Sequence, residues 1–161
     1  MELLNLLKPE AVKVINTVSS KKRLLQTVGE FAQTVYGIDS AKTVDALQER
    51  ETLGPTGVGS GVALPHARSS QLDRVVGSFI LLEKPVDFEA VDQQPVDIIF
   101  ALFAPENAGV EHLKALALVS RTLRDATLRT KLRANPDSST LFYNLDRSAE
   151  RAGRLNIRWL A

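Results

Sequence analysis

Apolar positions in the first third of the chain repeat at helical spacing in two segments. Between residues 24 and 36 they recur every three or four positions, which indicates a helix with one buried face. The serines at 19–20 can accept hydrogen bonds from its first amides, and Gly37 tolerates the left-handed conformation that often ends a helix. A second helix is predicted from Asp39 or Ser40 to about residue 54, and a short strand precedes both, over residues 12–18.

The middle of the chain changes from spaced apolar residues to continuous apolar runs. Residues 75–82 and 96–104 are almost wholly apolar, which favours strands of a sheet covered on both faces. Residues 110–124 then carry a broad apolar stripe at helical spacing, typical of a deeply packed helix. Two shorter helices are predicted after it: one contains Leu128 and Leu132 and stops before Pro136, and one is capped by Ser138 or Ser139.

The order of these elements predicts one α/β domain, with a mixed sheet flanked by helices on both sides. We expect this domain over residues 1–147 and a C-terminal tail over residues 148–161, which holds the lone tryptophan. A chain of 161 residues corresponds to about one domain and can bury a full hydrophobic core.

The charge balance and the cysteine count narrow the function classes. The chain has 20 Lys and Arg against 19 Asp and Glu, so its net charge of +1 gives no reason to expect binding to nucleic acid or to a membrane surface. It has no cysteine, which excludes disulfide scaffolds, thiol catalysis and cysteine-based zinc sites. No stretch approaches about 18 uninterrupted apolar residues, and no cleavage site follows the apolar N-terminus. We therefore expect a cytoplasmic protein.

Four glycines fall within the first eight residues of the segment GPTGVGSGVALPHAR, residues 54–68. This density predicts a loop with unusual backbone angles, whose amides could cradle a phosphate. The nucleotide P-loop does not fit, because no lysine lies between Lys42 and Lys84. The G-x-G-x-x-G pattern does not fit either, because Val62 and Leu64 occupy its third glycine position. Nucleotide binding is not expected, and a plain multi-glycine turn before a strand stays the alternative.

His66 lies at the exit of this segment and is the first of only two histidines. Pro65 restricts the backbone there and so aims the imidazole. A neutral imidazole is a good nucleophile near neutral pH, because its ordinary pKa is about 6.5. Arg68, two residues on, offers a guanidinium suited to an anion. An ordinary surface histidine is the alternative.

The second histidine, His112, falls in the predicted first turn of the helix over residues 110–124. The positive end of a helix dipole favours an anion or a neutral imidazole. The alternative is a partly exposed histidine without a function. Arg50, taken by itself, is most simply interpreted as a solvated residue of the second helix. The spacing of His66 and His112 predicts no metal site, and no G-x-S-x-G elbow supports a serine hydrolase.

The glycine-rich segment with its Pro-His pair resembles the active-site signature of the fructose/mannitol-type enzyme IIA domains of the bacterial phosphoenolpyruvate phosphotransferase system. The run QPVDIIFAL, residues 94–102, resembles the nitrogen-regulatory branch of that family, and EHLKAL, residues 111–116, matches the place of the family's second histidine. The resemblance covers roughly residues 3–146. It implies a mixed sheet between helices, as the pattern of apolar positions also does.

The resemblance implies a phosphotransferase that works through a phosphohistidine. His66 matches the histidine that accepts the phosphoryl group, on its Nε2 (tele) nitrogen, and His112 matches the residue that supports the transfer electrostatically. Arg50 matches an arginine that the family places beside the phosphate. The expected phosphate-binding loop holds Gly57, Gly59, Gly61 and Arg68, although the family more often has Gly-Lys or Gly-Thr after its Pro-His pair.

A histidine phosphocarrier protein is the donor that the resemblance implies, and sensor kinases or potassium transport proteins are the implied regulated partners. No metal, nucleotide or other cofactor is required. Two alternatives stay open: a sugar-specific IIA component that passes phosphate to a IIB domain, and a binding module that has lost phosphotransfer. The lack of a fused IIB or membrane segment disfavours the first, and the presence of both histidines disfavours the second.

Overall fold

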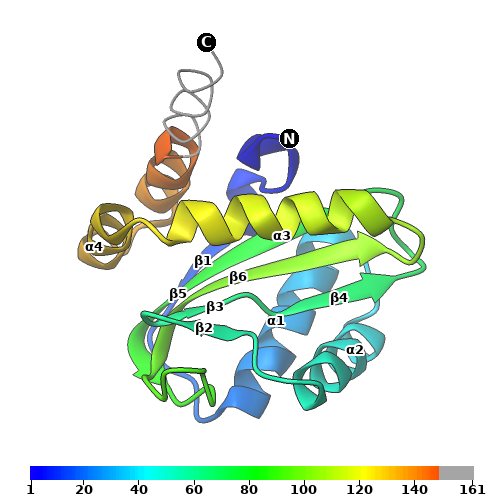
Figure 1. Ribbon diagram of the computed structural model, residues 1–161, viewed down its shortest axis with the longest axis horizontal. Coiled ribbons are helices and arrows are strands. Elements are labelled where there is room, and N and C mark those ends of the chain that lie inside the picture. Colours follow the sequence, from blue (N-terminus) through cyan, green and yellow to red (C-terminus); the bar gives the residue numbers. More distant parts are fainter. Residues whose placement is uncertain (149–161) are drawn as a thin grey trace.

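Six strands in the described part of the chain form one mixed sheet, and helices cover both of its faces (Figure 1). The computed structural model describes residues 1–148. The strand order is β1-β5-β6-β3-β2, and β4 lies beside β6 farther along the same edge as β3. The predicted α/β class, with a mixed sheet and helices on both sides, is confirmed.

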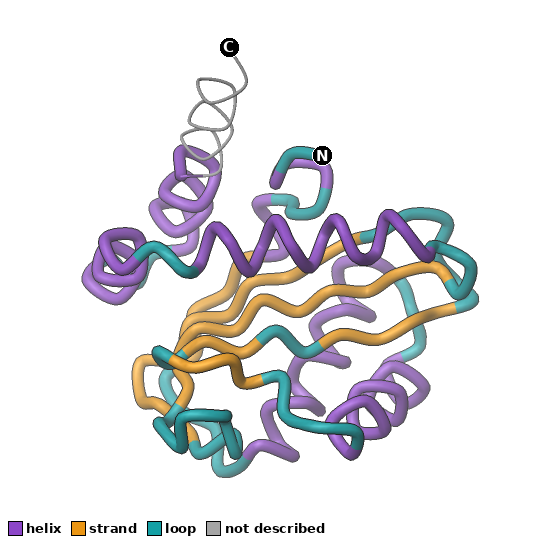
Figure 2. The backbone as a smooth tube through the Cα atoms, in the orientation of Figure 1, coloured by secondary structure: helices purple, strands orange, loops and turns teal. Residues whose placement is uncertain are grey.

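The strands are β1 (Val12–Ile15), β2 (Gly57–Gly59), β3 (Val62–Ala63), β4 (His66–Ser69), β5 (Val76–Val86) and β6 (Val96–Pro105). The helices are the short 3-10 turns η1 (Leu3–Asn5) and η2 (Pro9–Ala11), then α1 (Lys21–Tyr36), α2 (Ser40–Thr52), α3 (Gly109–Leu123) and α4 (Ala126–Ala134), with residues 138–148 also helical (Figure 2). Two lengths differ from the prediction: β1 stops at Ile15, and β5 continues four residues beyond residue 82.

The long strands β5 and β6 carry a hydrophobic core on each face. Phe79 and Phe100 point to the face covered by α3, where their rings meet edge to face at 6.3 Å. Their neighbours Ile80 and Ile99 point to the opposite face, which α1 and α2 cover. Burial on both faces explains why these strands are continuous apolar runs instead of alternating ones.

Most helix ends follow the expected capping chemistry. The Ser20 hydroxyl and the Asp39 carboxylate accept hydrogen bonds from first-turn amides of α1 and α2, and Gly37 ends α1 with a φ of 73°. The cap of the last helix is Asp137, whose carboxylate accepts from the amide and the hydroxyl of Thr140, so the predicted cap at Ser138 or Ser139 is wrong. Asp137 is the residue just before the first helical turn, so its carboxylate occupies the N-cap position, and both serines lie inside the helix.

The glycine-rich segment is not the single loop that its composition predicts. β2 and β3 form an antiparallel hairpin, and the two residues of its turn, Ser60 and Gly61, have φ values of 58° and 77°. Positive φ at both positions defines a tight turn whose twist matches that of the flanking strands. β3 and β4 then pair in parallel with β6. The glycines therefore build an edge of the sheet.

The C-terminal tail predicted over residues 148–161 lies outside the described residues, apart from Ser148. Within residues 1–148, no helix combines the length and the apolar character needed to cross a membrane.

Candidate active site

The topology places His66 on an edge strand of the sheet, facing α3. β4 runs parallel to β6 with His66 opposite Leu102, and the alternation of a strand turns Ala67 into the core beneath α1 and α2. His66 and Arg68 therefore point to the other face. β6 ends at Pro105, and the chain turns back across that face as α3 (Figure 1). This return brings the first turn of α3, which holds His112, over β4.

The two predicted histidines are neighbours in space. Their ring centroids are 5.3 Å apart, and the ring planes are inclined at 53°. His112 is only 6% exposed, so a partly exposed helix-start histidine is not what the fold contains. His66 is partly buried. A partly buried imidazole and an almost fully buried one thus share one site.

Two hydrogen bonds assign the protonation state of His66. Its Nδ1 lies 2.9 Å from the carbonyl oxygen of Leu64, and because a carbonyl only accepts, Nδ1 carries the proton. On the other side of the ring, Nε of Arg50 donates to Nε2 of His66 at 3.2 Å. A guanidinium only donates, so Nε2 presents its lone pair. The ring is therefore the neutral Nδ1–H tautomer, with its nucleophilic electron pair on Nε2.

The electrostatic surroundings favour this neutral form. Burial lowers the pKa of His66 below 6.5, and the charges of Arg50 and Arg68 lower it further, against the opposing effects of the Leu64 carbonyl and Glu51. Burial is also the main cause of the lowered pKa of His112, with smaller contributions from His66 and Arg68. At neutral pH both imidazoles are therefore uncharged.

Two arginines complete the cluster. Arg50, in the last turn of α2, donates from Nη1 to the carbonyl of Gly54 at 2.9 Å as well as to His66, so it is not a solvated helix residue. Arg68 donates from Nη1 to the carbonyls of Pro105 and Glu106, at 3.3 and 3.1 Å, just beyond β6. The structure thus brings together four of the predicted site residues, Arg50, His66, Arg68 and His112.

The glycines of the predicted phosphate loop lie elsewhere. The Gly61 carbonyl accepts from Ile98 on β6, whereas His66 pairs with Leu102, four residues farther along that strand. Four residues of a strand span roughly 13 Å. A Cβ at Gly57 would meet Ala90, and one at Gly59 would meet Asp92. The neighbours of these glycines thus belong to the β2–β3 hairpin and its surroundings.

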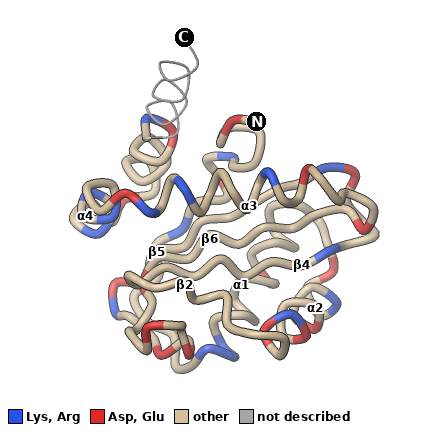
Figure 3. Tube along the Cα trace, viewed as in Figure 1, with Lys and Arg blue, Asp and Glu red and all other residues tan. Residues whose placement is uncertain are grey.

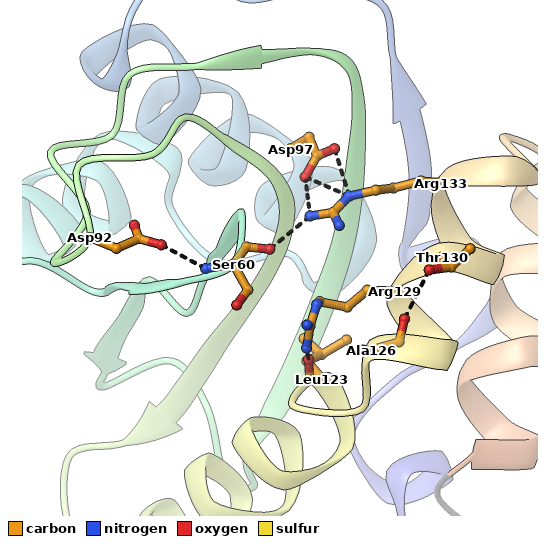
Figure 4. A network of polar contacts seen from close by, with 8 residues as sticks. All are labelled: Ser60, Asp92, Asp97, Leu123, Ala126, Arg129, Thr130 and Arg133. Carbon is orange, nitrogen blue, oxygen red and sulfur yellow. Dashed lines mark hydrogen bonds and ion pairs between the residues drawn. The ribbon is translucent and has the colours of Figure 1, made fainter.

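The hairpin turn has its own polar network, which no pattern in the sequence predicts. Arg133 on α4 binds Asp97 with two nitrogens, at 2.9 Å each, and donates to the carbonyl of Ser60 at 2.8 Å, while the Ser60 amide donates to Asp92 (Figure 4). Ser60 and Arg133 are 73 residues apart in sequence. No local sequence motif predicts this contact, because it depends on how the register of β6 and the packing of α4 bring distant residues together.

The sequence matches the family described as "Phosphoenolpyruvate-dependent sugar phosphotransferase system, EIIA 2" over residues 5–147. The chain belongs to this enzyme IIA family. Membership implies phosphotransferase activity in general, and contact with phosphocarrier or IIB partners. It also confirms the resemblance that the glycine-rich segment and its Pro-His pair carry.

Several relatives of this enzyme IIA are nitrogen-regulatory proteins. The nitrogen regulatory protein of Bradyrhizobium diazoefficiens is 43% identical over 142 residues, which cover 88% of this chain and 93% of the relative. The crystal structure of the nitrogen regulatory protein IIA-Ntr from Neisseria meningitidis superposes with a TM-score of 0.82 at 33% identity, covering 89% of this chain and 99% of that one. Sugar-specific proteins match as well: the fructose-specific EIIA component of Haloferax volcanii is 33% identical over 132 residues, 82% of this chain and 81% of its own.

Proposed function

We propose that this protein is a nitrogen-regulatory enzyme IIA. It accepts a phosphoryl group on Nε2 of His66 from a histidine phosphocarrier protein and regulates partner proteins through its phosphorylation state. The observation that carries the proposal is the fixed tautomer of His66, whose Nδ1–H is bound to Leu64 while Nε2 keeps its lone pair beside Arg50. An imidazole held in this form is ready to attack phosphorus without first losing a proton.

The transfer exchanges one phosphorus–nitrogen bond for another. The electron pair of His66 Nε2 forms the new bond in line as the carrier's phosphohistidine bond breaks, and the carrier's ring nitrogen leaves with that bond's electrons. Positive charge then spreads over the His66 ring to Nδ1–H, where the Leu64 carbonyl at 2.9 Å stabilises it. No proton needs to move in this step.

Arg50 and His112 supply the electrostatic support. Arg50 already donates to Nε2 at 3.2 Å, so a small shift moves its N–H groups onto the incoming phosphoryl oxygens. His112, with its ring centroid 5.3 Å from that of His66, offers a neutral imidazole that donates to an oxygen without competing for the phosphoryl group. Such preorganised donors act where the charge develops, in a site that excludes much of the water.

Regulation follows from the charge that the phosphoryl group brings. A phosphoryl group adds about −1.5 to −2 charges. On a chain of net charge +1 this reverses the local field around β4 and the start of α3. A partner docked on this face binds one form selectively, by no more than its differential affinity for the two forms. Sensor kinases and potassium transport proteins are the partner classes that we propose, on the resemblance of residues 94–102 to the nitrogen-regulatory branch.

The test combines labelling with partner capture. The protein is incubated with phosphoenolpyruvate, the upstream carrier proteins and labelled phosphate, and its phosphorylated and unphosphorylated forms then serve as baits in extracts of the source cell. We expect acid-labile, alkali-stable label and a different set of captured proteins for each form. His66→Ala is the permanently unphosphorylated control. Equal capture by both forms would contradict the regulatory role.

A sugar-specific role is the second candidate, because a fructose-specific EIIA component is among the matched relatives. A IIA of that kind passes its phosphoryl group to a IIB domain. Adding purified IIB proteins to the labelled protein separates the two functions: rapid and complete loss of label to one IIB, together with failed sugar uptake in a deletion strain, would favour the sugar role.

A further inference from the structure

We propose that Glu51 is a positioning residue for His66, acting through both of the hydrogen bonds that set the tautomer of the ring. The inference deepens the phosphotransfer role proposed above and names a residue outside the histidine–arginine cluster. The side chain of Glu51 is only 7% exposed, and its carboxylate contacts two residues. Lys21 lies 2.9 Å from Oε2, the Thr56 amide donates to Oε2 at 3.1 Å, and the Thr56 hydroxyl donates to Oε1.

One path from Glu51 leads to Nδ1 of His66. Thr56, which Glu51 holds by its amide and its hydroxyl, is buried. The Thr56 carbonyl accepts from the Leu64 amide at 2.9 Å, and the Leu64 carbonyl accepts from Nδ1 of His66, also at 2.9 Å. The position of the acceptor that keeps the proton on Nδ1 therefore depends on where Glu51 holds Thr56.

A second path leads to Nε2 of the same ring. The backbone carbonyl of Glu51 accepts from the Gly54 amide at 3.2 Å, and the Gly54 carbonyl accepts from Nη1 of Arg50 at 2.9 Å. Nε of Arg50 in turn donates to Nε2 of His66. Glu51 thus holds the turn between α2 and β2 at both ends, by its backbone at Gly54 and by its side chain at Thr56.

Lys21 fixes the carboxylate from the opposite side. It stands at the first position of α1, its side chain is 17% exposed, and its Nζ lies 4.6 Å from the centre of the buried Phe88 ring. A buried charge pair of this kind is costly to break, because the remaining partner is left uncompensated. The carboxylate of Glu51 is therefore a rigid anchor between α1, α2 and the segment that leads to His66.

A small displacement of the Glu51 carboxylate is expected to lower the rate of phosphoryl transfer even when the protein stays folded. A misplacement of about 1 Å can reduce a rate by about 100-fold even when it originates away from the reacting atoms. Loss of the Thr56 contact frees the Leu64 carbonyl to move, and the ring of His66 then populates the second neutral tautomer, in which Nε2 carries the proton. In that tautomer Nε2 has no lone pair to offer.

The experiment compares Glu51→Gln and Thr56→Val with the matched control Glu49→Gln. Glu49 is an exposed glutamate of the same helix, and the contact found for it uses its backbone carbonyl, so the control removes a charge and leaves the anchor intact. Nitrogen-15 NMR of the imidazoles reports the tautomer of His66 without any transfer reaction. Rates of phosphoryl uptake are measured over a range of phosphocarrier concentrations.

We expect the wild type and Glu49→Gln to show the Nδ1–H tautomer and equal rates. Glu51→Gln and Thr56→Val should show a mixture of tautomers and a maximal rate about 10- to 100-fold lower, with an unchanged KM for the carrier. Thr56→Ser, which keeps the hydroxyl and the amide, should restore both readouts. A folded Thr56→Val protein with the wild-type tautomer and rate would overturn the proposal. Should the wild type accept no phosphoryl group from any carrier, the proposed function fails, while the tautomer measurement still decides the role of Glu51.

Discussion

Two parts of the glycine-rich segment, the region of His66 and the Ser60–Gly61 turn, make different kinds of contact with the rest of the molecule. At His66 the contacts are few and partly buried, the ring is neutral, and its pKa is lowered by desolvation. At the Ser60–Gly61 turn the contacts are more numerous, but they join the full opposite charges of Arg133 and Asp97, whose side chains are 37% and 15% exposed. Figure 3 shows that α4 is rich in basic residues, and one of them, Arg133, binds this turn.

The difference teaches that a rich polar network is not by itself a sign of chemistry. At the turn, Arg133 and Asp97 bind each other, and Arg133 also binds the Ser60 carbonyl. These groups join the hairpin to α4 and are already paired, so they do not indicate a ligand site. At His66 the neutral ring has an unprotonated Nε2, and burial lowers the pKa of the ring. These are conditions that favour a nucleophile. Four predictions test this division between a reactive end and a structural end.

The largest effect is expected at His66. His66→Ala should take up no label from a phosphorylated carrier, because the nucleophilic Nε2 is lost. Ser60→Ala, at the other end of the segment, keeps the backbone contacts with Arg133 and Asp92 and should be labelled like the wild type. Label that persists in His66→Ala protein would place the acceptor elsewhere and break the comparison.

His112→Ala should still be labelled, but more slowly. In the proposed mechanism the ring supports the transferring phosphoryl group without carrying it, and removal of one such electrostatic contact is expected to cost about 10- to 1,000-fold in rate. Rapid-quench measurement of phosphoryl exchange with the carrier checks this. A wild-type rate in a folded His112→Ala protein would make this buried imidazole a packing residue only.

Gly61→Ala should act on stability and leave chemistry alone. The residue has a φ of 77°, and a Cβ there would meet Arg133 and, at 2.9 Å, Asp97. Strain at a positive φ and a displaced ion pair should together cost about 1–3 kcal/mol in the free energy of unfolding. Denaturant titration measures this cost. A lower labelling rate in the folded Gly61→Ala protein would show that the turn and the region of His66 are coupled.

The smallest effect is on the pH dependence of stability. The pKa of His66 is lowered in the folded protein, so the unfolded chain binds a proton first as pH falls below about 6.5. Stability should therefore fall with decreasing pH from there until the folded protein also binds the proton, and should be independent of this group above 6.5. His66→Gln should flatten that part of the profile, as measured by denaturant unfolding at several pH values. An unchanged profile would mean that burial does not perturb the ring.

Local chemistry made much of the fold predictable. The caps Ser20 and Asp39 and the stop at Gly37 act within one turn of the chain, and the apolar runs of β5 and β6 report burial on both faces directly. The hairpin of β2 and β3 was not predicted, because glycine density marks unusual backbone angles without saying whether strands flank them.

The sequence pattern named the candidate histidines and arginines, but it did not indicate the hydrogen bonds that join them. The Pro65–His66 pair and the family resemblance indicate the acceptor, yet the Arg50–His66 contact needs α2 to pack against the edge of the sheet at β4. The role proposed for Glu51 depends on Lys21, 30 positions earlier, and on Leu64, 13 positions later, and no sequence spacing encodes such a path.

The start of α3 carries a consequence for protein engineering. α1, α2, α4 and the final helix each begin at a side chain that accepts from first-turn amides, whereas α3 begins at Ala108, for which no such bond is found in the described residues. Ala108→Asp would be an obvious stabilising design, since a good cap contributes about 0.5–2 kcal/mol. It would also add a permanent negative charge one turn before His112, in competition with the phosphoryl group. A stabilising cap at this position is therefore expected to reduce the rate of the proposed phosphoryl transfer.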